Sequence, residues 1–433
     1  MKRGVETRIS SVLDRREPGL RIRRPSCESR DSIRSVLAGL VRAVCRLHMQ
    51  MILVGMALCA TGIPISAQPP TFVVPDQAAC LECRIELAGP VIISDADSAG
   101  WLTDAINLAR GPDGRFFVIS QINRSSMIVL DAGGRRLKTV GRRGSGPGEY
   151  AMLIPPAFGP SDIIQAIDVV QMRRTLLDSS LEFIETRPLA MRPTGYELLQ
   201  DGRMVASGVV PTPSRVGYPL HIIGHDGNIT RSFGAASPSF RADLAHLSWR
   251  RIAVTDDERI WAAPVNSYRL ELWDTAGALL ETIEREAEWF DAWVAPPAGS
   301  VAERPPAPSI LHVWIHGNQM WVMARVADRD WTPLTGGRRG VESGNRLIET
   351  DELDSIYDTM VEVIDLDSRR LITSRRFGQA FFPVRGAARA VYAYAPTADD
   401  EPRFEVWTLD LVPRSGGSGL ASMQCPIPGD TGG

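Results

Sequence analysis

Residues 106–150, with the sequence INLARGPDGRFFVISQINRSSMIVLDAGGRRLKTVGRRGSGPGEY, decide the fold of this chain. Short apolar runs in this stretch are separated by tight turns at Asp113-Gly114 and Gly133-Gly134 and by a polar gap. This alternation is typical of four short strands joined by hairpins. The stretch therefore predicts one blade of a β-propeller, which the glycine-rich run Gly141–Tyr150 closes.

Two short patterns recur along the chain and alternate with each other. The first, a polar turn followed by an apolar strand, includes Asp113, Asp162, Asp201, Asp257, Gly317 and Ala388. The second, an apolar strand that ends in a turn, includes Asp131, Asp178, Asp226, Asp274, Asp365 and Asp410. Because one sheet cannot bury both of its faces, such units stack around an axis until the ring closes. The repeats predict an all-β fold, a six-bladed β-propeller of four-stranded antiparallel blades over residues 68–424.

The blade from Ile106 to Tyr150 resembles an NHL-type repeat, and Gly141–Tyr150 resembles the signature of bacterial secreted six-bladed β-propeller proteins. The likeness is strong over residues 83–150 and is a matter of pattern from 151 to 413. Blade two departs from it by lacking the glycine turn, and blade five by a large insertion. Since that group has no settled biochemical activity, the resemblance implies a fold and export but no reaction.

The charge of the chain is divided unevenly. Residues 1–67 hold 12 of the 48 basic and 5 of the 51 acidic side chains, so the remainder carries a net charge of about −10. An acidic body disfavours nonspecific binding to nucleic acid. We therefore expect no nucleic-acid partner.

The N-terminal region has the pattern of a secretory signal peptide. Arg42 and Arg46 precede an apolar run from Met51 to Ile65, and Ser66-Ala67 follows. The alternative is a membrane anchor, but the run is shorter than the ~20 residues that span a bilayer. We predict that residues 1–67 are a leader and signal peptide, that no membrane span remains after their removal, and that the protein is periplasmic or extracellular. Residues 425–433 are expected to form a C-terminal tail.

Three cysteines follow the predicted leader, namely Cys80, Cys83 and Cys425. Because a ring brings the chain ends together, we predict that Cys425 bonds Cys83 or Cys80. Two alternatives stay open: a local CxxC motif with redox or zinc chemistry, and free or mixed thiols. Zinc would need two more ligands in register, and no βαβ context supports a thioredoxin-like site.

The predicted blades also assign loops to faces. Connections between blades and loops between second and third strands share one face, which we call the loop-rich face. It is predicted to carry Ser120–Ser126, Gly141–Tyr150, Glu284–Pro308 and Ala327–Thr359. Long loops on one face often carry function.

Tryptophan and arginine dominate binding energy where they are desolvated, so the loop-rich face supplies the candidate ligand contacts. The candidates are Arg142, Arg143, Glu149, Tyr150, Trp289, Trp293, Arg329, Trp331, Arg338 and Arg339. The alternatives are that the two long insertions have no binding role, and that Arg142 and Arg143 are solvated or form internal salt bridges.

Two other motifs have structural explanations. Gly146-Pro147-Gly148 is predicted to form a type II turn, because Pro147 lacks the amide that would grip a phosphate and no Gly-Lys-Ser/Thr follows. His221 and His225, like His312 and His316, lie four apart, which on a strand separates them by about 13 Å. This spacing is too wide for two ligands of one zinc ion, so we predict no metal site.

Two functions agree with this reading. The first is an exported noncatalytic propeller that needs no cofactor and binds a protein, peptide or glycan at the cell envelope through its loop-rich face. The second is a hydrolase or lyase resembling propeller lactonases, with calcium or another divalent cation held in the central channel by carboxylates and amides. Converging carboxylates at the channel would favour the enzyme, and an apolar plug would favour the binding module.

Overall fold

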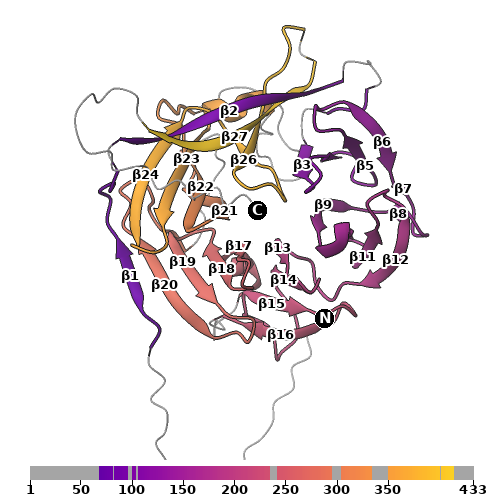
Figure 1. Cartoon of the computed structure of the whole chain (residues 1–433), viewed down its shortest axis with the longest axis horizontal. Helices are drawn as coiled ribbons and strands as arrows, with labels where there is room; N and C mark the ends of the chain where they lie inside the picture. The colour runs from indigo at the N-terminus through magenta and orange to yellow at the C-terminus, as the bar shows by residue number, and fades with distance from the viewer. Residues whose placement is uncertain are drawn as a thin grey trace, which may run out of the picture. The chain divides into compact units, whose positions relative to one another are not determined.

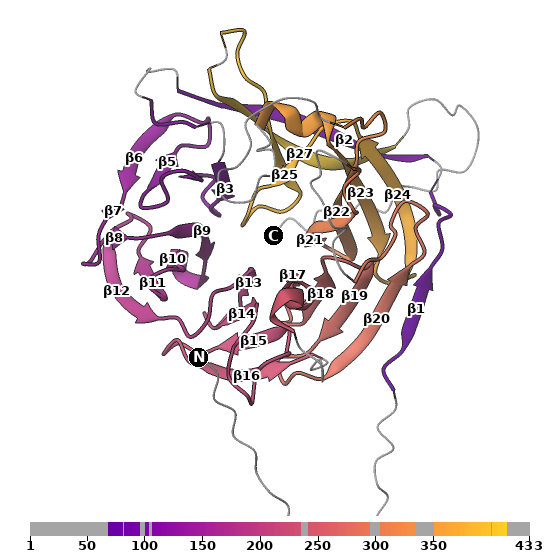
Figure 2. The ribbon, with the colours of Figure 1, turned by 180° about the vertical axis from the view of Figure 1, so that it is seen from behind.

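The computed structural model describes residues 68–80, 82–95, 100–103, 106–234, 241–294, 304–333, 350–399 and 401–413. Six sheets of four or five strands surround a common axis in residues 69–413 (Figure 1, and from behind in Figure 2). In five of the sheets, four strands follow one another in chain order from the axis outward. The chain therefore folds as a six-bladed β-propeller, as its repeats predict.

The first three blades occupy residues 106–233. Blade one consists of β3 (Ile106–Arg110), β4 (Phe116–Ser120), β5 (Met127–Leu130) and β6 (Arg136–Val140). Blade two consists of β9 (Leu153–Phe158), β10 (Ile164–Asp168), β11 (Arg173–Leu177) and β12 (Phe183–Pro188). Blade three consists of β13 (Gly195–Leu198), β14 (Met204–Ser207), β15 (Leu220–Ile223) and β16 (Ile229–Phe233).

The last three blades include both ends of the folded chain. Blade four consists of β17 (Arg250–Val254), β18 (Ile260–Pro264), β19 (Arg269–Trp273) and β20 (Leu279–Arg285), with β1 (Thr71–Val74) added in parallel to β20. Blade five consists of β21 (Ser309–His316), β22 (Gln319–Ala327), β23 (Tyr357–Asp365) and β24 (Arg370–Phe377). Blade six consists of β25 (Phe382–Pro383), β26 (Ala390–Tyr394), β27 (Arg403–Pro413) and β2 (Cys83–Ser94).

The remaining elements are short. The parallel pair β7 (Arg142–Arg143) and β8 (Glu149–Tyr150) joins blades one and two. Three 3-10 helices, η1 (Pro160–Asp162), η2 (Ala242–Ser248) and η3 (Thr350–Ser355), lie in connections. None of the helices in the described ranges has the length and apolar character that crossing a membrane requires.

The repeated patterns occupy equivalent places in the blades. The first pattern forms the turn between the first and second strands of every blade, where Gly114 and Gly202 adopt φ of +82° and +83°. The second pattern ends the third strand of blades one to five. The sixth copy, at Asp410, was wrongly expected to end a strand, because β27 continues to Pro413. Its outer neighbour is β2, so no hairpin is needed at that point.

The ring is closed by hydrogen-bonded strands. β2 pairs with β27 from Cys83 opposite Pro413 to Ser94 opposite Arg403. The predicted bond from Cys425 to Cys80 or Cys83 is wrong, because Cys80 and Cys83 are bonded to each other with 5.4 Å between their Cα atoms. The β2–β27 ladder already joins the two ends of the propeller, and the two thiols lie only three residues apart.

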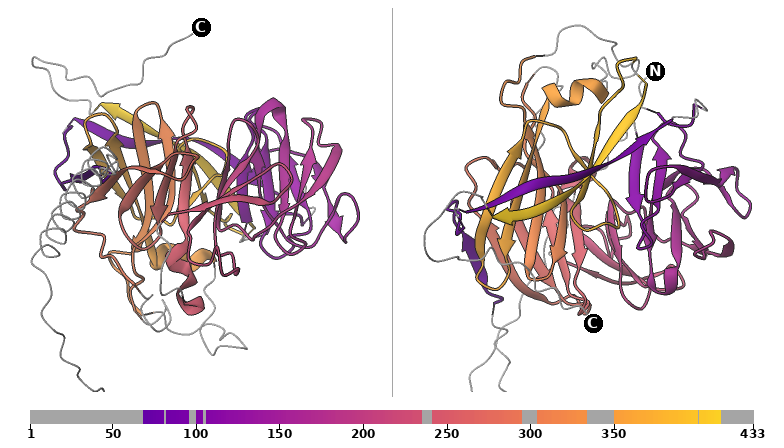
Figure 3. Two further views of the ribbon diagram at one scale, coloured as in Figure 1. Left: turned by 90° about the horizontal axis from the view of Figure 1, so that it is seen from below. Right: turned by 45° about the horizontal axis from the view of Figure 1, so that its top comes forward.

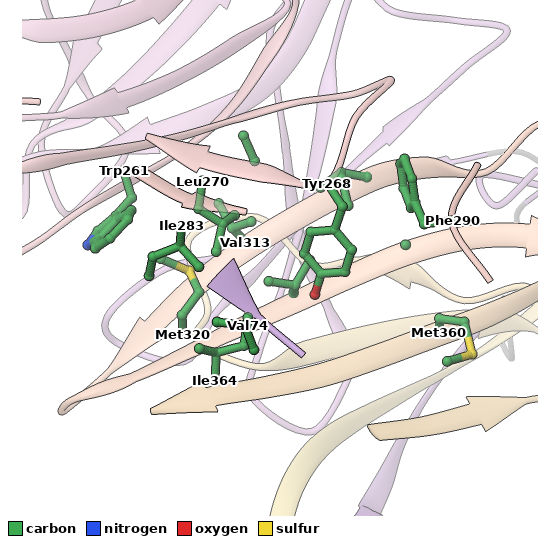
Figure 4. Close-up of a cluster of buried hydrophobic side chains, with 14 of the residues drawn as sticks. Val74, Trp261, Tyr268, Leu270, Ile283, Phe290, Val313, Met320, Met360 and Ile364 are labelled. Carbon is green, nitrogen blue, oxygen red and sulfur yellow. The ribbon is translucent and has the colours of Figure 1, made fainter. Parts of the chain in front are cut away.

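The hydrophobic core is divided among the six interfaces between neighbouring blades, each of which holds one cluster of buried apolar side chains. The cluster between blades four and five contains Trp261, Tyr268 and Met320, with Val74 contributed by β1 (Figure 4). Burial of one large apolar side chain contributes roughly 1.5–3 kcal/mol. Each blade is therefore held mainly by its two neighbours, which explains why the repeat must close.

Several predicted features lie outside the described residues. These are the leader and signal peptide (1–67), the tail (425–433), Cys425, Arg338 and Arg339.

Candidate functional site

The strand pairing confirms the predicted assignment of loops to one face. Antiparallel order places the ends of the second strands and the starts of the innermost strands together, so the described parts of all four predicted loops lie on the loop-rich face. The short helices η2 and η3 lie on the same side of the ring (Figure 3). The opposite face, which we call the turn face, carries the turns between first and second strands and between third and fourth strands.

The Gly141–Tyr150 loop is held by its own polar groups. The amide of Glu149 donates to the carbonyl of Gly146 (3.1 Å) and Gly148 has φ of +70°, as the predicted type II turn requires. The Glu149 carboxylate accepts from the amides of Gly146 (2.8 Å) and Ser145 (3.0 Å) and from Arg142 (2.9 Å). These bonds, the Gly146 amide first, lower the pKa of Glu149 below its usual value.

Three of the candidates in this loop, Arg142, Glu149 and Tyr150, therefore have structural roles. The Tyr150 side chain is fully buried, so the prediction that it contacts a ligand is wrong; its ring fills the space beneath Gly141. Arg142 forms the internal salt bridge that the alternative interpretation proposed. Arg143 is exposed.

The two tryptophans of the connection between blades four and five use their indole N–H groups internally. Trp289 donates to Glu362 (3.1 Å), which also accepts from the buried Arg285 (3.0 Å). Trp293 donates to the carbonyl of Pro308 (2.7 Å), and its ring stacks on His246 with 5.4 Å between centroids. Both side chains are half-buried, so they anchor this connection and present only part of each ring to solvent.

The insertion in blade five is described only at its two ends. Arg329 is exposed and Trp331 is half-buried, with its amide donating to the carbonyl of Asp328 (3.3 Å). These two residues remain candidate contacts on the loop-rich face.

Exposed apolar side chains distinguish the loop-rich face more clearly than its tryptophans do. Ile122 (76% exposed) and Val170 (46%) lie in loops of blades one and two on this face, and Trp249 (38%) and Val294 (71%) in the connections before and after blade four. The other large apolar side chains that are similarly exposed in the described ranges lie on outermost strands or on β1. The turns of the opposite face hold none of those side chains.

The turn face is hollowed between blades four and five, where a cavity of about 480 Å³ is lined by Asp257, Asn318 and Asp367 among others. Its polar groups bond each other: Asn318 donates to Asp365 (3.0 Å) and Asp367 (3.1 Å), and Asp257 pairs with Arg259 (2.6 Å). Several polar groups of the hollow are therefore already paired within the protein.

Near the axis three blades bring basic side chains together, a feature that the sequence reasoning missed. Arg251 comes from the innermost strand β17, Arg325 from the second strand β22, and Arg385 from the turn that follows β25; we call these the axial arginine cluster. The six innermost strands contain a single carboxylate, Glu197 on β13. Converging carboxylates were expected for an enzyme and an apolar plug for a binding module. The axis shows neither, because its notable feature is a group of arginines.

Arg385 connects opposite sides of the ring. It starts from blade six, and its guanidinium donates to the Tyr196 carbonyl and to Glu197 (3.1 Å), both in blade three. The guanidinium carbon also lies 3.8 Å from the centroid of the Tyr196 ring. Blades three and six face each other in a ring of six, so this side chain spans the axis.

The electrostatics of the cluster reflect buried like charges. Burial, together with repulsion from Arg385 and Arg325, lowers the pKa of Arg251 to about 10. Burial and the same kind of repulsion, from Arg385 and Arg251, lower the pKa of His312 well below its usual value, which keeps this imidazole neutral. Burial raises the pKa of Glu197 against the attraction of Arg385.

The axis does not fit the calcium ion of the alternative function. Calcium takes six to eight oxygen ligands, several of them carboxylates. Glu197 is the one carboxylate on the innermost strands, and it is paired with Arg385. Across the part of the chain that the structure describes, no three His, Cys, Asp or Glu side chains are grouped to hold a metal ion.

Comparison with known proteins supports the fold. No protein-family model and no curated protein matches this sequence. The solved structure of a candidate exported protein from Bacteroides fragilis is similar over 79% of this chain and 100% of that chain, with a TM-score of 0.52 and 12% identity. A member of the DUF4221 family from Bacteroides vulgatus is similar over 77% and 99%, with a TM-score of 0.51 and 10% identity. At such identities the likeness shows the six-bladed propeller fold alone.

Proposed function

We propose that this protein is an exported, noncatalytic β-propeller whose loop-rich face binds a protein or peptide partner at the cell envelope. The observation that carries the proposal is the placement of Ile122, Val170, Trp249 and Val294, which are exposed at successive positions around this face. Apolar side chains held in water at loop tips gain free energy when a partner covers them. Trp249 is the one aromatic among them, which favours a polypeptide over a glycan stacked on several aromatic rings.

Export follows from the N-terminal pattern and agrees with the oxidised Cys80–Cys83 pair, because disulfides persist in oxidising compartments. Cell fractionation of a tagged full-length chain should recover the processed protein outside the cytoplasm. Recovery of the unprocessed chain in the cytoplasm would contradict this part of the proposal.

The binding face is tested with two double variants of matched chemistry. Ile122→Asp with Val294→Asp changes the loop-rich face, and Leu137→Asp with Phe183→Asp changes exposed positions on the outermost strands. A partner is first isolated with the wild-type protein from envelope extracts, identified and purified, and its affinity is then measured by calorimetry. We expect the first variant to lose at least about tenfold in affinity, which corresponds to 1.4 kcal/mol, and the second to bind normally. Equal binding by both variants would show that the face is assigned wrongly.

A further inference from the structure

The axial arginine cluster concentrates positive charge in the interior of the ring. Of the three guanidinium groups, that of Arg385 is paired with the carboxylate of Glu197, and the nearby His312 is neutral. Buried charges of one sign are unfavourable unless an opposite charge accompanies them. The repulsion between these buried positive charges destabilises the folded chain, and an anion bound at the axis would relieve it.

The hydrogen-bonding groups of the cluster are also incompletely used. Each guanidinium carries five N–H donors. Arg251 donates to the carbonyls of Ile310 (3.2 Å) and Thr194 (3.5 Å), and Arg385 to Tyr196 and Glu197. The Nε of Arg325 is buried and has no hydrogen-bond partner within the described structure.

Aromatic rings fix the plane of Arg325. Its guanidinium carbon lies 4.5 Å from the centroid of Tyr357 and 5.3 Å from that of Phe382. A guanidinium that stacks on a ring keeps the N–H groups at its edge free, and the planar fork matches the two oxygens of a carboxylate. Arg325 also bonds the Tyr357 side chain, but its Nε has no partner, so part of its edge is left to meet an oxyanion.

Water reaches this region although it is enclosed by strands. The side chains of Glu197 and Arg385 are 30% and 17% exposed, and Arg251 and Arg325 are partly exposed. Arg251 lies next to the first residue of β17 and Arg325 two residues before the end of β22, both at the ends of strands nearest the loop-rich face. A small ligand would therefore reach the cluster from that face.

We propose that Arg251, Arg325 and Arg385 form a binding site for a small organic anion, recognised through its carboxylate or phosphate oxygens. The site is independent of the partner proposed for the loop-rich face, because it involves none of the exposed apolar residues. Arg251 and Arg385 supply charge while they also tie neighbouring or opposite blades together. Arg325, which forms no salt bridge within the described chain, supplies a planar edge whose Nε is unpartnered.

The test uses the mature propeller and defined probes. Citrate, succinate and inorganic phosphate are titrated by calorimetry and by thermal melting, with sodium chloride at matched ionic strength as the reference. We expect at least one of these oxyanions to raise the melting temperature beyond the salt reference. Stronger binding of the carboxylates would identify a carboxylate ligand, and stronger binding of phosphate a phosphate ester. Failure of all three to exceed the salt reference would overturn the proposal.

Variants assign the binding to the cluster. Arg325→Gln should weaken oxyanion binding at least tenfold, whereas Arg389→Gln, which changes an arginine paired with Asp410 away from the axis, should leave it unchanged. Arg325→Lys keeps the charge and removes the planar fork, so it should retain the fold and lose several-fold in carboxylate affinity. Equal affinities for Arg325→Gln, Arg325→Lys and the wild type would also overturn the site.

Discussion

The turn face and the loop-rich face reverse the same strands but satisfy their polar groups in different ways. On the turn face several reversals are closed by a carboxylate of their own turn: the Asp201 carboxylate accepts from the amide of Arg203 (2.9 Å), and Asp226 accepts from the amide of Asn228 (3.0 Å). On the loop-rich face some loops are closed in the same way, as Glu149 closes Gly141–Tyr150, but other connections are held by distant groups, as where the amide of Arg250 donates to the hydroxyl of Ser207 (2.8 Å).

This difference separates folding from binding. A turn closed by its own carboxylate has few groups left for a ligand, and the six copies repeat because each performs the same local task. A connection held at its base by another blade leaves its tip free, and the tips at Ile122 and Val294 are apolar and exposed. The turn face should therefore tolerate substitution poorly, and the loop-rich face should tolerate it well.

The largest expected effect compares one glycine on each face. Gly227, on the turn face, has φ of +81°, and a Cβ there would lie 2.0 Å from the Pro188 carbonyl oxygen in blade two. Gly148, on the loop-rich face, has φ of +70° with nothing within 4 Å of such a Cβ. Gly227→Ala should lower the free energy of unfolding by about 3–4 kcal/mol, and Gly148→Ala by roughly 1–2 kcal/mol.

Urea denaturation of both glycine variants measures these losses. Comparable destabilisation by the two substitutions would contradict the distinction between the faces. Both glycines have a positive φ, so both alanine variants are destabilised by backbone strain. The difference between their free energies of unfolding therefore measures the clash with blade two alone.

The fold could be predicted from the sequence because its information is local. An Asp-Gly turn and the strand that follows it form from adjacent residues, so six weak copies reinforce one another. The failures occurred where the chain ends meet. The sequence does not show that β2 completes blade six, and without that ladder both the extra turn at Asp410 and the bond to Cys425 were reasonable expectations.

The axial site could not be predicted because its information is not local. Arg251, Arg325 and Arg385 come from three blades, and no repeat specifies how deep each strand sits relative to its neighbours. For Trp289 and Trp293 the sequence likewise could not show the surroundings of the side chains. Their residue type suggested binding, but the acceptors of their N–H groups, Glu362 and Pro308, become visible only in the folded chain.

The expected effect of intermediate size is a loss of stability at low pH, which should begin at a different pH on each face. His221 supports the loop between the second and third strands of blade three: its Nε2 donates to the Gly208 carbonyl (3.2 Å) and its Nδ1 accepts from Ser232 (2.8 Å). Burial lowers its pKa from 6.5 to about 4. As the pH falls, His221 is therefore protonated in the unfolded chain before it is protonated in the folded one. The free energy of unfolding should fall by roughly 3 kcal/mol between about pH 6.5 and about pH 4.

The turn face should respond at lower pH. Hydrogen bonds from the side chain and backbone of Asn228 lower the pKa of Asp226 below 3.8, so its stabilising effect is present above that value and is lost as the pH falls below it. Urea midpoints measured from pH 7 to pH 3 follow both changes. His221→Gln should make the profile between pH 6.5 and pH 4 shallower by the share of His221, leaving the loss due to the buried His312 and the part below pH 4; an unchanged profile would refute the assignment to His221.

The smallest expected effect lies within the loop-rich face, in the Gly141–Tyr150 loop. Arg142 is 79% exposed, and exposed ion pairs contribute little to stability, so Arg142→Ala should shift the melting temperature by no more than about 2 °C. Glu149→Ala should shift it further, because the amides of Ser145 and Gly146 lose their acceptor. Calorimetric melting of the two variants measures the difference. A larger loss for Arg142→Ala would mean that the salt bridge, not the carboxylate closing its own turn, holds this loop, and that the local closure seen on the turn face does not extend to the loop-rich face.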